Sequence, residues 1–370
     1  MKRILIAAIL VFFGPIQASH VLVKTKEVEA GESDKLKAEQ VAVTQDMPPS
    51  TILGKIADNE NFDKRELFIA DSIRLRNENS KIPIHHRGDH IFRVATYNVH
   101  FWIDALGNPS YENIMQVIKN INPDVLILQE VDNGPTRYNR LSEEQLAKRF
   151  HDLGYEYQKF CQAAMFRGAP FGNMILSKYP TQFTSKIFKV DEDNPRERRC
   201  FIHALIDLPN QEKLSLYGTH LDVWDESEKT RSEEIAELIA IADKDTNKNI
   251  VIAGDFNALR KKDYAYTIKG KNAWELIQRD DQMRGIMNTP IDALELIEKA
   301  GFADSFSKAA LTGPKFTVWP GRVVDFIFLK DSWNLPLQGS YVYYDAASDH
   351  LPIILDINIG ASHFPGGKRD

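Results

Sequence analysis

The segment Asn249-Ile250-Val251-Ile252-Ala253-Gly254-Asp255-Phe256-Asn257 joins a short apolar run to a glycine, an acid and an amide. A run dense in Ile and Val over five residues predicts a strand buried on both faces. Gly254 is typical of the turn that follows such a strand, so Asp255 and Asn257 are expected at its end. Two positions apart on an extended segment, their side chains would lie on the same side of the chain.

The same arrangement recurs along the chain. Five further motifs place acid, amide or imidazole groups beside an apolar run: Thr96-Tyr97-Asn98, Leu128-Gln129-Glu130-Val131, Gly218-Thr219-His220-Leu221-Asp222, Val324-Asp325-Phe326-Ile327 and Ser348-Asp349-His350. Ligand sites of layered α/β proteins lie at strand ends, because only there can polar groups converge without being buried in the core. We therefore expect the six motifs to meet at one rim of the fold.

Taken singly, most of these motifs have an ordinary structural interpretation. Asn98 suits a turn, Glu130 suits a strand end that reaches solvent, and His220 suits a hydrogen-bonded core position. Asp325 is harder to explain in this way, because an acid within the apolar run 323–328 would be half buried and needs a partner. Six coincidences in one chain are improbable, so the repetition favours a shared site.

Strands and helices alternate in the predicted organisation of the chain. The predicted strands are Phe92–Asn98, Asp124–Gln129, Tyr155–Gln162, Gly172–Ser177, Cys200–Asp207, Lys213–His220, Asn249–Ala253, Val324–Leu329 and Pro352–Ile357. Predicted helices run from Ser110 through Ile118, from a capping box of Ser142 and Gln145 to Gly154, over Glu233–Asp243, and from Pro290 to Gly301. This order predicts mixed sheets covered by helices in a single compact domain.

Composition and charge restrict the class of protein. The 370 residues are 43% hydrophobic and 26% charged, which excludes a collagen, a disordered chain and a disulfide-stapled miniprotein. Lys and Arg total 46 against 52 Asp and Glu, so a polyanionic substrate must be bound by local contacts. One local candidate is the run Arg196-Glu197-Arg198-Arg199, which is either a solvated loop or the source of an arginine that binds phosphate bidentately.

The first residues have the three parts of a secretory signal peptide, namely a charged start, the apolar run Ile4–Phe13, and small residues before a cut near Ala18. The run is short for a bilayer span, which takes about 20 residues, although an uncleaved membrane anchor remains the alternative. We therefore expect an exported protein, secreted or periplasmic. The expected parts are a signal peptide over 1–18, a partly flexible N-terminal extension over 19–90, a catalytic domain over 91–360 and a C-terminal tail over 361–370.

Cys161 and Cys200 are the two cysteines of the chain, and they do not form a zinc-cluster pattern. In an oxidising compartment they could form one disulfide. Buried free thiols are the alternative, because cysteine is a common core residue.

In their order along the chain, the six motifs resemble those of the endonuclease/exonuclease/phosphatase superfamily, and the resemblance spans Phe92 to Ile359. The run Gly172–Lys178 also resembles an internal strand of that family. The resemblance implies an α+β fold of the deoxyribonuclease I type. This is a four-layer α/β-sandwich in which two mixed β-sheets pack face to face and are flanked by helices, with a metal-dependent phosphoesterase site at one rim.

The resemblance also implies a role for each motif. Glu130 is the expected principal ligand of Mg²⁺, with Asn98 and Asp349 near the ion or its water shell, and Mn²⁺ is expected to substitute. The implied catalytic residues are five. Asp255 orients or deprotonates the attacking water, and Asn257 and His350 contact phosphoryl oxygens. Asp325 accepts the other ring proton of His350, and His220 is a second donor near the leaving or bridging oxygen. The expected substrate-binding residues are Asn98, Asn257 and Arg199.

These expectations describe an exported Mg²⁺-dependent phosphoesterase that hydrolyses a phosphodiester bond, with nuclease activity in first place. A sphingomyelinase or phospholipase-C-like phosphodiesterase and an inositol-phosphate phosphatase are the enzymatic alternatives. A degenerate binding module on the same fold is the alternative without activity. The expected partner is a phosphodiester substrate, either nucleic acid or a phospholipid headgroup. No obligate protein partner is evident from the sequence, and we expect a monomer.

Overall fold

The computed structural model describes residues 88–191, 198–225, 227–264, 267–268, 271–272, 293–311, 316–318 and 322–360. The expected signal peptide and C-terminal tail lie outside the described residues, as do the N-terminal extension before residue 88 and the helix start at Pro290. Among the helices that the structure describes, none is both long and apolar enough to cross a bilayer.

In the first of the two six-stranded sheets, the first and the last of the described strands are neighbours. Its strands in order are β13 (Leu337–Val342), β14 (Ile353–Asn358), β1 (Ile91–Asn98), β2 (Val125–Asp132), β4 (Ala169–Ser177) and β3 (Tyr157–Phe166). The β1 and β2 strands are parallel and the other neighbours are antiparallel. The pairing of β1 with β14 continues past the ends of the strands, because the Ile359 backbone N–H donates to the His90 carbonyl over 2.9 Å.

The second six-stranded sheet is built in the same mixed way. Its strands in order are β11 (Phe302–Asp304), β12 (Asp325–Lys330), β8 (Ile250–Asp255), β7 (Lys213–His220), β6 (Cys200–Asp207) and β5 (Thr181–Ile187). The β7 and β8 strands are parallel and the other neighbours are antiparallel. A separate two-stranded antiparallel pair consists of β9 (Thr267–Ile268) and β10 (Lys271–Asn272).

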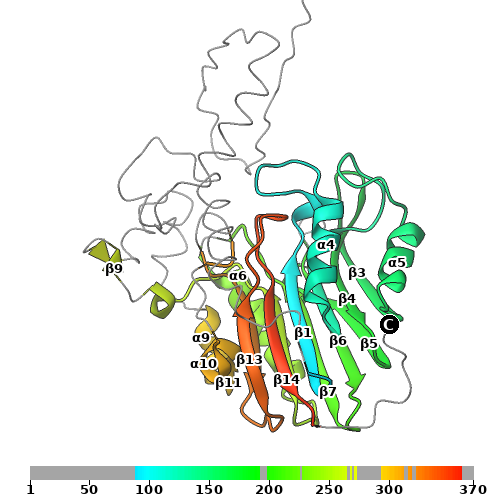
Figure 1. Ribbon diagram of the computed structural model, residues 1–370. Coiled ribbons are helices and arrows are strands. Elements are labelled where there is room, and N and C mark those ends of the chain that lie inside the picture. Colours follow the sequence, from blue (N-terminus) through cyan, green and yellow to red (C-terminus); the bar gives the residue numbers. More distant parts are fainter. Residues whose placement is uncertain are drawn as a thin grey trace, which may run out of the picture. The chain divides into compact units, whose positions relative to one another are not determined.

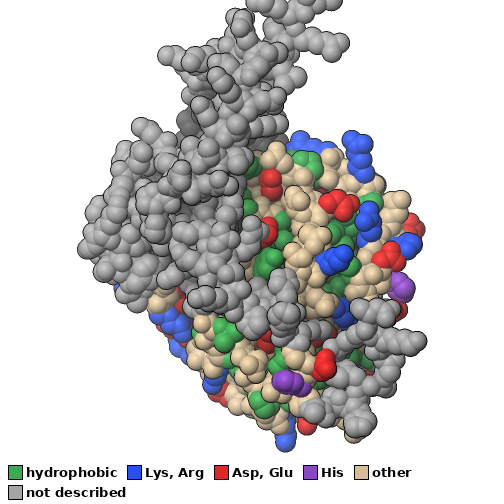
Figure 2. Space-filling model, in the orientation of Figure 1, with side chains coloured by type: hydrophobic (Ala, Val, Ile, Leu, Met, Phe, Trp, Pro, Cys, Tyr) green, Lys and Arg blue, Asp and Glu red, His purple; other side chains and the backbone are tan. Residues whose placement is uncertain are grey.

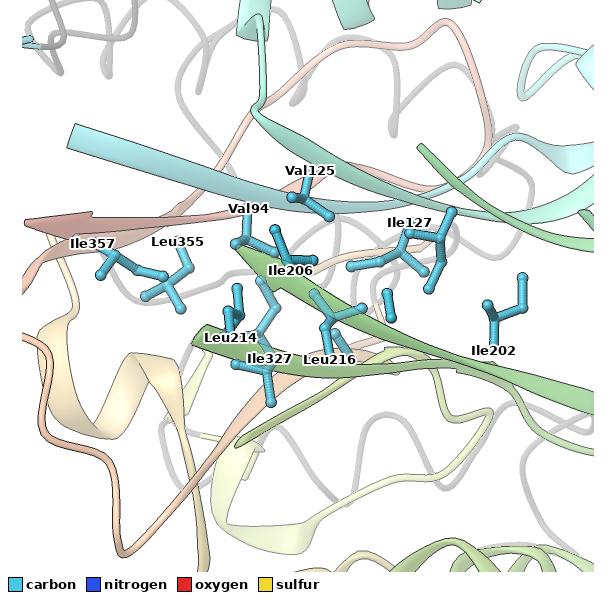
Figure 3. Close-up of a cluster of buried hydrophobic side chains, with 14 of the residues drawn as sticks. Val94, Val125, Ile127, Ile202, Ile206, Leu214, Leu216, Ile327, Leu355 and Ile357 are labelled. Atoms are coloured by element: carbon cyan, nitrogen blue, oxygen red, sulfur yellow. The ribbon is translucent and has the colours of Figure 1, made fainter. Parts of the chain in front are cut away.

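The core lies between the two sheets, because each strand turns alternate side chains toward the other sheet. Val94 and Ile127 from the first sheet and Leu216 and Ile327 from the second are fully buried in one hydrophobic cluster. Figure 3 shows these side chains interleaved between the two layers of ribbon. Burial of this large apolar surface is the main driving force for the association of the two sheets.

Helices cover the outer faces of the sheets and complete the four layers of the predicted sandwich (Figure 1). Over the first sheet, α4 (Tyr111–Ile121) and α5 (Glu143–Asp152) contribute buried side chains to one cluster. Over the second, α6 (Lys229–Ala242) and α9 (Ala293–Lys299) contribute to another. The remaining short helices are η2 (His100–Trp102), η3 (Lys189–Asp191), η4 (Lys261–Tyr264) and α10 (Ser305–Ala309).

The predicted helix ends are confirmed in part. The capping box is present, since Ser142 Oγ accepts from the Gln145 N–H while the Gln145 side chain accepts from the Ser142 N–H. The helix that follows Ser110 runs three residues beyond the predicted end and terminates at Asn122, whose φ of 49° lies in the left-handed region that asparagine tolerates. The helix predicted over Glu233–Asp243 begins earlier, at Lys229.

Five of the strands that the structure describes were not predicted, namely β5, β9, β10, β11 and β13. The β5 and β13 strands lie at sheet edges. The β5 strand is half-exposed, and β13 contains Gln338, Gly339 and Ser340, so neither has the dense apolar run that marks a central strand. Cys161 and Cys200 are buried free thiols, with Cys200 Sγ donating to the Cys161 carbonyl over 3.4 Å.

Gly218 allows the two sheets to approach closely near the end of β7. A Cβ atom at this position would lie 2.7 Å from Ile127 Cγ2 and 2.9 Å from Ile175 Cδ1, both on the opposite sheet. The glycine of the Gly218-Thr219-His220 motif is therefore needed for packing, and it helps to hold His220 close to residues of the other sheet.

We expect Gly218→Ala to lower the free energy of unfolding by about 1–3 kcal/mol, because the added methyl group overpacks the interface between the sheets. The urea midpoint at unchanged m-value measures this loss. Gly134→Ala is the matched control, since its Cβ would approach no atom nearer than 3.4 Å. An unchanged midpoint for Gly218→Ala would contradict the close packing described here.

Candidate active site

Strand topology brings four polar residues to one rim of the sandwich. Asn98 ends β1 and Glu130 lies near the end of its parallel neighbour β2. On the other sheet, His220 and Asp255 end the parallel strands β7 and β8 and are paired in register. Glu130, His220 and Asp255 offer ligand atoms that lie within 4.8 Å of one another. The predicted convergence of motifs from both sheets is therefore present in the structure.

Asn98 bridges the two sheets through its side-chain amide. Its Nδ2 donates to Glu130 Oε1 over 3.0 Å and to Asp255 Oδ2 over 2.9 Å, while its Oδ1 accepts from the His100 N–H over 2.9 Å. The Ser348 hydroxyl donates to the Asn98 carbonyl over 2.9 Å, which fixes the backbone as well. Asn98 thus holds two carboxylates close together that would otherwise repel each other.

Glu130 has an unusual backbone for an acid at a strand end. Its φ is 56°, and the pairing of β2 with β4 shifts register between Leu128 and Val131, so the strand bulges at this residue. Within the described part of the chain, Glu130 Oε2 is buried and has no hydrogen-bond partner. Burial raises the pKa of Glu130, and the neighbouring imidazole of His100 opposes this rise. Such a carboxylate oxygen is suited to a cation.

Asp255 and Asn257 converge on His220, but not for the predicted reason. Asn257 has a φ of 48°, so the segment is not extended, and the Asp255 carboxylate accepts from the Asn257 N–H over 2.9 Å in a tight turn. The turn places Asn257 Nδ2 3.0 Å and Asp255 Oδ2 3.7 Å from His220 Nε2. Burial raises the pKa of Asp255, but nearby histidines and hydrogen bonds lower it further, so the carboxylate is ionised at neutral pH.

Arg199 sets the protonation of His220. Burial and the adjacent guanidinium lower the pKa of His220 to about 3, so the ring is neutral at pH 7. Arg199 can only donate, and it lies 3.3 Å from Nδ1, so Nδ1 must accept and Nε2 carries the proton. In this tautomer the acceptors nearest to the Nε2 proton are the carboxylates of Asp255 and Glu130, 3.7 and 4.0 Å away, because Asn257 Nδ2 is itself a donor and bonds to the Leu221 carbonyl over 3.1 Å. His220 therefore presents an N–H donor to the rim, where Asp255 and Glu130 lie.

His350 and Asp325 form the predicted pair. His350 Nδ1 lies 3.0 Å from Asp325 Oδ2, and its Nε2 lies 3.7 Å from Asp255 Oδ2. Burial alone would lower the pKa of His350, but the carboxylates of Asp325 and Asp255 outweigh burial and raise it to about 10. Burial raises the pKa of Asp325 to about 6. At pH 7 the pair is therefore an imidazolium and a carboxylate, and the sequence-based partner for Asp325 is the observed one.

Asp349 and Arg199, the predicted metal neighbour and phosphate clamp, each contact a histidine in the structure. Asp349 Oδ1 lies 3.2 Å from His100 Nδ1, and Asp349 belongs to neither of the metal-compatible groups found among the described residues. Arg199 is buried against His220. The role of Asp349 near a metal and that of Arg199 toward phosphate stay predictions.

Two residues near the site were missed by sequence reasoning. His100 lies 3.2 Å from the Asp349 carboxylate, and its imidazole also opposes the rise in the pKa of Glu130. Its only sequence signal is its position two residues after Asn98. Thr317 Oγ1 accepts from the Asp325 N–H over 3.2 Å and so fixes the start of β12. A lone threonine within a loop carries no signal of this contact.

The comparisons with known proteins agree with this geometry. A family model described as "Endonuclease/Exonuclease/phosphatase family" matches residues 95–350. A search of curated proteins gives no match.

Three solved structures illustrate the shared fold. A protein of the same family from Beutenbergia cavernae is 20% identical, with a TM-score of 0.52, and the match covers 74% of this chain and 72% of that one. ANGEL2, a 2',3'-cyclic phosphatase, is 18% identical over 73% of this chain and 95% of its own, with a TM-score of 0.51. A variant of the 3' phosphatase NExo from Neisseria, bound to a product DNA hairpin, is 14% identical over 72% and 99%, with a TM-score of 0.51. Together with the family model, the sheet order and the convergent rim show that this chain belongs to the endonuclease/exonuclease/phosphatase family and is a phosphoesterase.

Proposed function

We propose that the protein is a Mg²⁺-dependent phosphodiesterase that acts as a nuclease. One observation carries the proposal: Asp255 Oδ2 lies 3.7 Å from Nε2 of both His220 and His350. An ionised carboxylate flanked by two N–H donors can orient a water toward a phosphorus atom while the donors bind its oxygens. Export of the enzyme is a further proposal that rests on residues 1–18 of the sequence alone.

The residues at the rim fit a hard divalent cation. The buried Glu130 Oε2 has no hydrogen-bond partner within the described residues, and Asp255 supplies a second carboxylate within 4.8 Å of Glu130. Mg²⁺ prefers oxygen ligands and keeps several waters, so one or two carboxylates suffice, and Mn²⁺ accepts the same set. Such an ion supplies charge stabilisation to the phosphoryl oxygens when bound. Asn98 presents its nitrogen to these carboxylates and its oxygen to His100, so direct ligation by Asn98 stays a prediction.

Three side chains of the protein supply the remaining catalytic groups. Asp255 holds the attacking water, because its pKa is lowered and it is ionised at neutral pH. His350 donates from Nε2 as an imidazolium, and Asp325 orients the ring through Nδ1. His220 donates from Nε2 as a neutral imidazole, because Arg199 occupies Nδ1. A charged and a neutral donor thus flank the same carboxylate, a combination suited to a phosphoryl group that gains charge in the transition state.

EDTA is expected to abolish hydrolysis of a small phosphodiester chromogen, and Mg²⁺ to restore it. Glu130→Gln should raise the Mg²⁺ concentration needed for half-maximal rate by about tenfold or more, as losses around metal sites commonly do. Glu112→Gln, at an exposed position on α4, is the control. Equal rates with Mg²⁺, with EDTA and for His350→Ala would leave only a binding module on this fold.

His220→Ala is expected to lower kcat by about 10²–10³, the usual cost of removing one pre-aligned hydrogen-bond donor. Steady-state kinetics on the chromogen measure this loss. His151→Ala, which changes an exposed histidine on α5, should retain the wild-type rate. A kcat within twofold of wild type for His220→Ala, about 0.4 kcal/mol in barrier height, would remove His220 from the proposed machinery.

Asp325→Asn should move the alkaline limb of the rate profile to lower pH. His350 is protonated below its pKa of about 10 and loses its proton above it, and the Asp325 carboxylate contributes to that raised value. Removal of the carboxylate therefore lowers the pKa of His350, while Asp255 still raises it in part. We expect slower turnover and unchanged Mg²⁺ dependence. An alkaline limb at the wild-type pH would contradict the assigned role of Asp325.

A screen of supercoiled DNA, RNA, sphingomyelin and inositol phosphates separates nuclease action from the alternatives. We expect hydrolysis of nucleic acid. Hydrolysis of sphingomyelin or inositol phosphates alone would replace the nuclease proposal with that alternative.

A further inference from the structure

An aromatic patch capped by arginines lies on the surface next to Glu130. We define this aromatic–arginine patch by six residues from η2, the loop after β2 and the β3–β4 hairpin: Phe101, Arg137, Tyr138, Phe166, Arg167 and Phe171. Phe171 is buried and forms its base, and its ring is stacked on Phe101 with centroids 5.4 Å apart. Phe166 lies 5.2 Å from Phe101 and is 38% exposed.

Arg167 covers this patch with its planar guanidinium. The group lies 4.2 Å from the centroid of Phe101, 5.0 Å from that of Phe166 and 5.3 Å from that of Tyr138. Arg137 lies 4.4 Å from the Tyr138 ring. Both arginines are exposed, and within the described residues neither forms an ion pair. The outer faces of these stacked planar groups are therefore open to a further planar group that carries negative charge nearby.

The backbone holds the patch in place. His100, Phe101 and Trp102 have φ values of 44°, 54° and 66°, three consecutive residues without glycine in the left-handed region. Such a conformation costs energy and persists only when the surrounding structure fixes it. Arg167 has a φ of 52° and is followed by Gly168 at 88°, which is the geometry of a tight hairpin turn. The Phe101 and Arg167 side chains are thus presented by constrained turns.

The patch is adjacent to the proposed catalytic rim. The His100 ring lies 5.4 Å from that of Phe101, and His100 is paired with Asp349. A substrate whose phosphate lies beside Glu130 would therefore place the group next to that phosphate over Phe101 and Arg167. Figure 2 shows acidic and basic side chains interspersed on the face that it draws, so binding of a polyanion must depend on such local features.

We propose that the aromatic–arginine patch stacks an unpaired base next to the scissile phosphate, so the preferred substrate is single-stranded nucleic acid. This inference rests on the proposed phosphodiesterase activity. Bases in a duplex are already stacked on one another, whereas unpaired bases expose their faces to aromatic and arginine side chains. A membrane surface is disfavoured, because the Arg167 guanidinium covers the rings of Phe101, Phe166 and Tyr138 and would have to enter the apolar phase with them.

The test compares two patch variants with a control on the same strand. Phe166→Ala removes an exposed ring, and Arg167→Asn removes the guanidinium with a residue that tolerates the left-handed backbone. Tyr157→Ala is the control, because Tyr157 begins the strand that Phe166 ends and is 36% exposed. Circular dichroism checks that each variant is folded.

Binding of a short fluorescein-labelled oligothymidylate to the full chain is measured by anisotropy in EDTA, which prevents turnover. We expect each patch variant to weaken binding about tenfold, the usual effect of one lost base stack. A strand of the same length with abasic nucleotides should bind wild type and Phe166→Ala alike, because this substitution removes a ring and no charge. Tyr157→Ala should bind the oligothymidylate and hydrolyse the chromogen as wild type does.

Three outcomes would overturn the inference. The first is that the patch variants bind the oligothymidylate as tightly as wild type does. The second is that wild type binds abasic and normal strands equally. The third is that the patch variants no longer cosediment with phosphatidylserine vesicles but still bind the oligothymidylate as wild type does. Failure of the wild-type protein to hydrolyse the chromogen with Mg²⁺ would instead refute the proposed activity. Because anisotropy is read without turnover, the two failures are distinguishable.

Discussion

The rim of this protein depends on the compensation of one buried anion, the carboxylate of Asp255. A carboxylate removed from water is costly unless hydrogen bonds and opposite charges replace its hydration. Asn98 supplies a hydrogen bond from the first sheet, the Asn257 backbone supplies another, and His350 supplies positive charge. Asn98 and His350 are far from Asp255 in the sequence, so the same requirement that stabilises the anion also closes the polar edge of the sandwich.

His220 is neutral and His350 is cationic at neutral pH, although both rings are buried beside Asp255, because their Nδ1 atoms face different groups. Nδ1 of His220 faces the guanidinium of Arg199, whereas Nδ1 of His350 faces the carboxylate of Asp325. Burial lowers the pKa of both rings, Arg199 lowers that of His220 further, and the carboxylates of Asp325 and Asp255 raise that of His350 above its usual value. The fold thus provides a neutral and a cationic donor around one carboxylate without any difference in residue type, and the distinction lies entirely in the neighbours behind each ring.

The convergence of the six motifs and the sandwich of mixed sheets could be predicted from the sequence. Polar residues at the ends of dense apolar strands can meet without being buried in the core only at the rim of the sheets. The edge strand β13 could not, since its polar residues resemble a loop. The bulge at Glu130 arises from pairing across strands, which no local pattern records. The contact of Arg199 with His220 joins neighbouring strands and was hidden within an ordinary basic run.

The pairing of β1 with β14 has a consequence for protein engineering. Because Ile91 lies opposite Asn358, the described chain enters and leaves the sandwich at neighbouring points. Asn98 lies at the other end of β1, and eight residues of strand separate that entry from the catalytic edge by about 25 Å. A short tether could therefore connect residues 88 and 360 in a circular permutant of the described sandwich, with its junction at the end of β1 opposite the catalytic edge.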